Sequence, residues 1–445
     1  MSEPVELLVT GGTVLTVDGP GTVVPAGAVA IRDGVIVTVG PADELAGRFA
    51  AAEVLDATGC LVMPGLVNTH AHLAMNLFRG EADDVSLEQF LERLVAAEVA
   101  QLSAATVAIG VEAALAECIR GGITTALDMY WYPEAATEVA GRVGFRLFNG
   151  PSFMDVVDPD GRDFDQRMAW AEDLLTRSRE DDTTAPLWVM PHSAYLLSRE
   201  QLDRVVQLAR RFDAYVHVHA GESPGEDDAV LARHGGRPIP VLEAAGVLGP
   251  RTVVAHAVRL DDDDITRFAE SGTAVAHCPV SNLNIGCGIA RLPELLRAGV
   301  PVGLGTDGAA SAGALDLFTG MRLAALLHKG VTLDPRTVGA ERAVRLATAG
   351  GASVLGQGDR IGSLTAGRRA DLIVVDMHRP HVVPNTDVWS AVAYDLAAAD
   401  VRHTVVDGRV LMRDRLLTTI DEAAVLDRML QLRRERTAAD RGEKP

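Results

Sequence analysis

Apolar and polar residues alternate through the first part of the chain, as they do in half-buried β-strands. The stretches "ELLVTGGTVLTVDG", "GAVAIRDGVIVTVG" and "EVLDATGCLVM" carry this pattern, and Gly-Gly and Asp-Gly pairs separate them as hairpin turns. The pattern returns near the other end, in "RADLIVVDM" and "VRHTVVDGRVLMRDRLL". We therefore predict one small β-sandwich built from both ends of the chain, residues 1–62 and 366–445. The last polar residues, 433–445, are expected to form a frayed tail.

Between these two ends, short apolar runs alternate with segments of helix length. This alternation is typical of parallel strands joined by helices. The strand candidates are "GLVNT", "TTALDM", "FRLFNG", "LWVMP", "AYVHVH", "TVVAH", "TAVAH" and "PVGLGTD". Parallel strands in this number and order predict a (β/α)₈ barrel over residues 63–365. The first connection holds an extra helix in "SLEQFLERLVAAEVAQLS", where Ser86 and Gln89 fit a capping box, and we expect this helix to lie over the barrel mouth.

Composition narrows the classes of function. The 445 residues carry a formal net charge of -20, which disfavours a nucleic-acid partner because such binding needs a basic surface. The four cysteines form no C-x-x-C pair and indicate reduced thiols. The first residues lack the basic and apolar segments of a secretory leader, and no apolar run is long enough to cross a bilayer. We expect a cytoplasmic protein with neither a nucleic-acid nor a membrane partner.

Histidines and acids collect where the predicted strands end. The carboxyl ends of barrel strands share one face, and barrel enzymes carry their chemistry on that face. Most of the 12 histidines fall at these ends. The candidates are His70, His72, His192, His217, His219, Glu222, His256, His277 and Asp307. A single histidine at such a place is usually a hydrogen-bonded loop residue, but convergence of all of them on one face indicates a functional site.

Four of these residues form a candidate metal site. His70 and His72 lie two positions apart on one strand, so their side chains point to the same face. With His219 and Asp307 they would supply three imidazoles and one carboxylate and leave a position for water, as a catalytic metal requires. Such a set suits Zn²⁺ or Fe²⁺, and we predict one divalent metal per chain, with zinc as the first candidate. His217 lies further from the strand end than His219, so we predict it as a neighbour of the ligands.

Five motifs in the chain resemble the amidohydrolase superfamily. They are "PGLVNTHAH", "HVHAGES", "AHAVRL", "HCPVSN" and "GLGTDGAAS". The longer segments "THAHLAMNLFRGEADD" and "GRPIPVLEAAGVLGPRTVVAHAVRL" are similar to one branch, the 5'-methylthioadenosine/S-adenosylhomocysteine deaminases and triazine chlorohydrolases. The resemblance covers nearly the whole chain. It implies a distorted (β/α)₈ barrel with a composite β-sandwich, a small heterocyclic substrate and a homo-oligomer.

The resemblance also implies roles for single residues. His70, His72, His219 and Asp307 match the metal ligands, Glu222 matches the carboxyl group that shuttles protons to the substrate ring, and His256 matches the histidine that contacts the attacking hydroxide. Asp307 would also accept the proton of the attacking water. Glu98, Arg146 and His192 fall near positions that bind the nucleoside, Glu98 at the ribose hydroxyls and the other two on the 5' side.

These roles predict hydrolytic deamination of an amino-substituted purine, with a 5'-modified adenosine (methylthioadenosine, adenosylhomocysteine or adenosine) as the first candidate. A guanine-like base, a pterin and aminofutalosine remain alternative substrates. Triazine chlorohydrolase remains an alternative activity. Glu222 favours deamination, because an amine leaving group needs a proton and chloride does not. A binuclear site bridged by a carboxylated lysine is excluded because no lysine precedes Lys329. A non-catalytic scaffold is disfavoured because every ligand candidate is retained.

Overall fold

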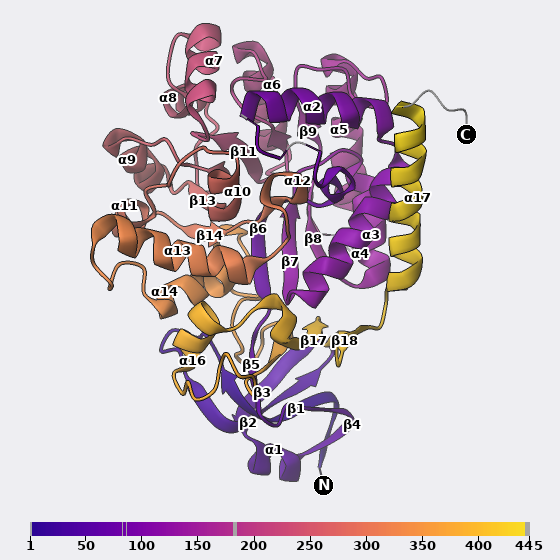
Figure 1. Ribbon diagram of the computed structural model, residues 1–445, viewed down its shortest axis with the longest axis vertical. Helices are drawn as coiled ribbons and strands as arrows, with labels where there is room; N and C mark the ends of the chain where they lie inside the picture. The colour runs from indigo at the N-terminus through magenta and orange to yellow at the C-terminus, as the bar shows by residue number, and fades with distance from the viewer. Residues whose placement is uncertain (1, 82, 86, 181–184, 441–445) are drawn as a thin grey trace.

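The computed structural model describes residues 2–81, 83–85, 87–180 and 185–440, which form a larger lobe with helices outside and a smaller lobe rich in strands (Figure 1). The smaller lobe holds β1 (Glu3–Leu15), β2 (Val23–Arg32), β3 (Val35–Pro41), α1 (Ala42–Arg48), β4 (Phe49–Asp56) and β5 (Cys60–Pro64), and from the other end β16 (Leu372–Asp376), β17 (Val401–Val406), β18 (Arg409–Arg413) and β19 (Leu416–Leu417). Their order is β19-β18-β17-β16-β5-β1-β2-β3, with β4 beside β1. Because β16 pairs antiparallel with β5, both ends of the chain share one sheet. The predicted composite sheet is confirmed, and its limits at residues 62 and 366 stay a prediction.

The alternation seen in the sequence explains why this sheet has apolar side chains on both faces. Along β1, Leu7 and Val9 lie in one small core while Leu8 lies in another. On the neighbouring β2, Val29 lies in the first of these cores and Ala30 in the second. Successive side chains of a strand point to opposite faces, so each strand contributes to both cores.

The larger lobe contains the predicted barrel strands in the predicted order. They are β6 (Leu66–His72), β7 (Ile123–Asp128), β8 (Arg146–Phe148), β10 (Met190–Pro191), β11 (Val216–Ala220), β12 (Thr252–His256), β13 (Ala274–His277) and β14 (Val302–Leu304). The short strands β9 (Ser152–Phe153) and β15 (Asp307–Gly308) follow β8 and β14. Parallel pairing runs from β15 through β6 and β7 to β8, from β9 to β10, and from β11 to β14. Single bridges between 189 and 216 and between 193 and 219 connect β10 with β11, so the eight strands form a distorted barrel.

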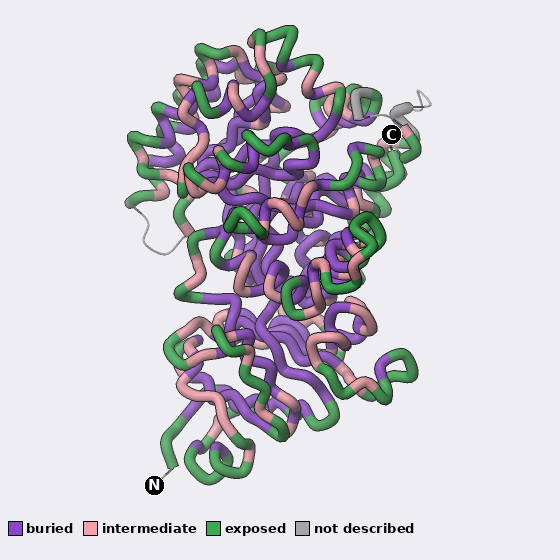
Figure 2. Tube along the Cα trace, turned by 90° about the vertical axis from the view of Figure 1, so that its left-hand side faces the viewer, coloured by how far each residue is buried: buried purple, intermediate pink, exposed green. Residues whose placement is uncertain are grey.

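Helices cover the outside of these strands, and the strands themselves are buried on both faces, as parallel sheets require. The main covering helices are α3 (Ala104–Arg120), α4 (Pro133–Val143), α5 (Phe164–Glu180), α6 (Arg199–Arg211), α7 (Pro224–His234), α8 (Pro238–Ala244), α9 (Asp262–Ser271), α11 (Leu292–Arg297), α13 (Leu317–Thr332), α14 (Ala340–Arg345) and α15 (Gly351–Val354). Buried positions run through the middle of both lobes and exposed ones lie outside (Figure 2). Short helices near the site or in the later loops are η1 (Leu73–Phe78), α10 (Pro279–Asn284), α12 (Ala309–Ala312), η2 (Leu346–Gly350), α16 (Val388–Ser390), η3 (Ala391–Asp395) and η4 (Ala398–Asp400).

The extra helix of the first connection is α2 (Leu87–Gln101), and it lies across the upper part of the barrel, as predicted (Figure 1). Ser86, the residue expected to cap it, lies outside the described residues. No single helix in the described ranges is long and apolar enough to span a membrane. The segments 89–101 and 104–120 pass that test only as a pair, and they are bent by 120°.

The expectation of a frayed tail is wrong as far as residue 440. Residues Glu422–Asp440 form one long helix, α17, which packs along α3 (Figure 1). Arg428 pairs with Glu112 at 2.7 Å, and Arg436 donates a hydrogen bond to the backbone oxygen of Leu77 at 3.0 Å. Val425 of this helix is buried in the main core and Met429 packs against it, so apolar and charged side chains dock the helix together.

Candidate active site

Strands β6 and β11 and the end of β14 bring three histidines and one aspartate together in the barrel. His70 and His72 project from β6, His219 projects from β11, and Asp307 begins β15. Asp307 Oδ1 lies 3.3 Å from Nε2 of His70 and 3.3 Å from Nε2 of His72. Nε2 of His72 lies 3.3 Å from Nε2 of His219. All four side chains are buried, so the alternation along the strands has placed them on one face as the sequence predicts.

The hydrogen bonds at the other ring nitrogen fix the tautomer of each histidine. Nδ1 of His72 donates to the backbone oxygen of Met129, and Nδ1 of His219 donates to the backbone oxygen of His192 at 2.9 Å. Carbonyl oxygens only accept hydrogen bonds, so both Nδ1 atoms carry the proton. The two Nε2 atoms therefore direct lone pairs at each other across 3.3 Å.

A hydrogen bond to His217 fixes the tautomer of His70. Nδ1 of His217 donates to the backbone oxygen of Val253 at 3.0 Å, so its Nε2 accepts from Nδ1 of His70 at 2.7 Å. Nε2 of His70 is then a bare lone pair, fully buried and without a hydrogen-bond partner among the described residues. Partners of this kind orient imidazole ligands in metal sites.

This donor set fits a divalent cation. Three lone pairs and a carboxylate oxygen converge with no hydrogen between them, which is unfavourable unless a positive charge lies at the centre. Two ligands about 2.05 Å from a tetrahedral zinc ion are about 3.3 Å apart, and the three separations given above have that length. Burial lowers the pKa of His70 to about 3 and that of His219 well below its usual value, so both rings are neutral at pH 7 and their lone pairs are available.

Two serines hold Asp307 in place. Ser281 Oγ and Ser311 Oγ each donate to Asp307 Oδ2 at 2.6 Å, which leaves Oδ1 facing the histidines. Asp307 has a φ of 64°, an uncommon conformation for a residue other than glycine. Gly305 precedes it, and a Cβ there would lie 2.9 Å from Cβ of His70. The sequence "GLGTDG" therefore lets this strand pass close to β6.

Glu222 and His256 lie beside the cluster and form a pair. Nε2 of His256 is 3.6 Å from Glu222 Oε1, and its Nδ1 donates to Asn282 Oδ1 at 2.9 Å. Burial raises the pKa of Glu222, although His256 opposes the rise. Burial would lower the pKa of His256, but Glu222 and Asp307 raise it. The pair therefore keeps a proton to a higher pH than an isolated glutamate would.

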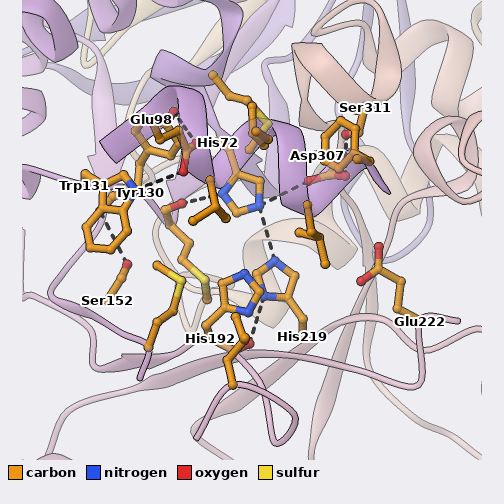
Figure 3. Close-up of a pocket in the computed structure, with 18 of the residues that line it drawn as sticks. His72, Glu98, Tyr130, Trp131, Ser152, His192, His219, Glu222, Asp307 and Ser311 are labelled. Atoms are coloured by element: carbon orange, nitrogen blue, oxygen red, sulfur yellow. Dashed lines mark hydrogen bonds and ion pairs between the residues drawn. The ribbon is translucent and has the colours of Figure 1, made fainter. Parts of the chain in front are cut away.

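Glu98 enters the site from α2 and is held by two aromatic residues. Tyr130 OH donates to its Oε1 at 2.6 Å, and Trp131 Nε1 donates to its Oε2 at 3.1 Å. Each oxygen keeps a second lone pair for another donor. Burial raises the pKa of Glu98 to about 7. Figure 3 shows this group on one side of His72 and Asp307, with Glu222 on the other side.

His192 also lies where the sequence predicts. It lines the same cavity, its ring centroid is 4.4 Å from that of His219, and burial lowers its pKa to about 3. His277 does not line this cavity, and its ring lies 6.3 Å from that of His328.

The prediction that Arg146 lies at the barrel mouth is wrong. Arg146 is the first residue of β8, so it lies at the amino end of that strand, away from the face that carries the site. Its guanidinium binds the carboxylates of Asp371 and Asp407. Asp371 has a side-chain exposure of only 2%, so Arg146 neutralises a buried acid at the junction with the smaller lobe.

Arg146→Met should therefore reduce stability by about 3 kcal/mol, because breaking a buried ion pair leaves Asp371 without its cation. Burial already raises the pKa of Asp371 against the effect of Arg146. Loss of Arg146 raises the pKa of Asp371 further. The loss in the free energy of unfolding should therefore be largest above this new pKa, and it should become smaller as the pH falls and the carboxyl group takes up a proton. Urea unfolding at pH 5 and pH 8 measures both effects.

The control is Arg297→Met, since Arg297 is 69% exposed and pairs with Glu294 at the surface. This variant should lose less than about 1 kcal/mol. A change of KM in Arg146→Met with unchanged stability would instead return Arg146 to the substrate site.

The structure adds residues that the motifs contain but that the sequence analysis did not single out. Ser281 and Asn282 belong to "HCPVSN", and Ser311 ends "GTDGAAS". Tyr130 and Trp131 follow β7, with only Met129 between the strand and Tyr130, and their position after a barrel strand was the available signal.

A cavity opens from the cluster toward α2. Its empty volume, including the open mouth, is about 990 Å³. The polar lining consists of His72, Glu98, Ser152, His192, His219, Glu222, His256, Asp307 and Ser311. The rest of the lining is apolar or aromatic, so the cavity suits a flat heterocycle with few polar groups.

Known proteins are similar to this chain in sequence and in architecture. The chain matches the amidohydrolase family over residues 61–411. A 5-methylthioadenosine/S-adenosylhomocysteine deaminase of Syntrophobacter fumaroxidans is 43% identical over 433 residues, which cover 97% of this chain and 99% of the relative. An adenosine deaminase of Xanthomonas campestris with bound zinc has a TM-score of 0.95 at 35% identity, covering 98% of this chain and 100% of the other. An atrazine chlorohydrolase of Arthrobacter aurescens complexed with zinc has a TM-score of 0.85 at 26% identity, covering 96% and 99%. The chain belongs to the amidohydrolase family.

Proposed function

We propose that this protein is a divalent-metal-dependent hydrolase that removes the amino group of a 5'-modified adenosine as ammonia. The observation that carries this proposal is the convergence of three histidine lone pairs and one carboxylate beside a buried Glu222 and His256. The names of the deaminase relatives agree with it.

We propose His70, His72, His219 and Asp307 as the ligands of one metal ion. Zinc is our first candidate, because a set rich in imidazole with one carboxylate suits it, and Fe²⁺ is the alternative. A divalent cation held there would lower the pKa of water toward about 7 and so supply hydroxide at neutral pH.

The chain's own residues would then move the protons. Asp307 accepts the proton that the attacking water loses, and His256 hydrogen-bonds to the attacking oxygen. Glu222 protonates the ring nitrogen beside the carbon that bears the amino group. The amino group takes the proton from Asp307 and leaves as ammonia, while the new hydroxyl group returns its proton to Glu222 as the carbonyl forms.

The remaining polar groups would bind the nucleoside. We propose that Glu98 accepts hydrogen bonds from the ribose hydroxyls, since each of its oxygens keeps a free lone pair after binding Tyr130 and Trp131. His192 is proposed to contact the 5' side from the same cavity.

The setting of the enzyme is also proposed. Cys60, Cys118 and Cys278 are buried free thiols, which agrees with a cytoplasmic protein, and the net charge of -20 argues against a nucleic-acid partner. A homo-oligomer is proposed from the family resemblance alone.

A substrate panel tests the reaction. Adenosine, methylthioadenosine, guanine and an aminotriazine are compared by absorbance change and ammonia release, with a chlorotriazine assayed for chloride. We expect turnover of the adenosines. Turnover of only the free base or a triazine would overturn the nucleoside assignment, and release of chloride alone would favour the chlorohydrolase alternative, to which the likeness to atrazine chlorohydrolase points.

A further inference from the structure

The described residues that line the cavity include three acids, Glu98, Glu222 and Asp307, but neither lysine nor arginine. Most of the remaining lining is apolar or aromatic, and includes Phe90, Leu94 and Met154. Arg146, the cation expected on the 5' side, lies at the other end of the barrel and is bound to Asp371 and Asp407.

Two arginines lie behind one wall of this cavity, and both are already bound. Arg162 and Arg167 line a neighbouring cavity that shares Tyr130, Trp131 and Ser152 with the first. Arg167 is only 1% exposed and donates to the backbone oxygens of Met154 and Val156, at 2.8 Å each.

The charges of both arginines are neutralised as well. Arg162 pairs with Asp160 at 2.9 Å and with Asp158 at 3.5 Å, and Arg167 lies 3.5 Å from the same Asp158 carboxylate. The Arg167 guanidinium also stacks over the Trp131 ring, with its central carbon 5.2 Å from the ring centroid. Both guanidinium groups therefore form their ion pairs with Asp158 and Asp160, which do not line the active-site cavity.

We propose that the site selects adenosines whose 5' substituent carries no carboxylate, such as hydrogen, hydroxyl or methylthio. The inference rests on the proposed deaminase function and refines its substrate class. A carboxylate inside the cavity would lose its hydration without gaining a lysine or arginine partner. The homocysteinyl group of S-adenosylhomocysteine carries such a carboxylate, whereas a methylthio group gains from the apolar walls.

Four adenosines separate charge from size. Their 5' groups are methylthio, butylthio, 3-aminopropylthio and homocysteinyl; the third retains the ammonium group of the fourth without its carboxylate. We expect kcat/KM for the homocysteinyl compound to be more than tenfold below that for the other three, because only it buries an unpaired carboxylate.

Three results would overturn the proposal. They are a homocysteinyl compound within tenfold of the butylthio compound, an aminopropylthio compound as slow as the homocysteinyl one, and a butylthio compound as slow as the homocysteinyl one. The second result would assign the exclusion to the ammonium group, and the third to length. Failure of all four adenosines, with turnover of another heterocycle, would instead refute the proposed function.

Discussion

The variant His72→Ala should lose its metal and its activity together. The substitution removes one of three lone pairs that converge on Asp307, and it also breaks the hydrogen bond to the Met129 carbonyl. Without the cation the site cannot generate hydroxide at neutral pH, and several kcal/mol of transition-state stabilisation are lost, so kcat should fall by at least about 10³-fold. Metal analysis after gentle purification should find about one ion per chain in the wild type and far less in the variant.

The control is His378→Ala, because His378 is an exposed histidine outside the barrel. It should keep both the metal and the activity of the wild type. Two tightly held ions per wild-type chain would contradict the single-metal assignment. Full metal content in His72→Ala would remove this residue from the ligand set.

The positions of the histidines could be read from the sequence because local geometry determines them. His70 and His72 are two residues apart on a strand, and His219 ends another strand of the same barrel, so alternation and parallel packing suffice to bring them together. The hydrogen bond from His70 to His217 depends on ring orientation, which no spacing encodes, and only the structure reveals it.

Contacts between segments that are distant in the sequence could not be predicted from strand alternation. Glu98 lies on an inserted helix, and its bonds to Tyr130 and Trp131 depend on how that helix crosses the barrel mouth. Arg146 was predicted at the wrong end of the barrel. Its strand spans only Arg146–Phe148, and a residue that begins such a strand lies at the opposite end of the barrel from one that ends it. The last residues of helix α17 were expected to fray because they are polar, and its docking through Val425 and Met429 together with Arg428 and Arg436 depends on contacts with distant segments.

Glu222→Gln should lower kcat about 10³-fold and leave the metal content near one ion per chain. Glutamine has nearly the same shape but cannot give and regain a proton, and general acid–base catalysis contributes roughly 10²–10⁴-fold. Glu222 is buried beside His256 and outside the histidine cluster that would hold the metal, so the defect should appear in chemistry and not in metal retention.

The step at which Glu222 acts makes this last prediction specific. Glu222 is proposed to protonate the ring nitrogen before the leaving group departs, so 6-chloropurine riboside should lose about as much activity in Glu222→Gln as adenosine does. The exposed Glu270→Gln is the matched control and should behave as the wild type on both compounds. A much smaller loss on 6-chloropurine riboside would show that Glu222 serves the departure of the amino group instead, and full deaminase activity in Glu222→Gln would refute its role as the proton shuttle.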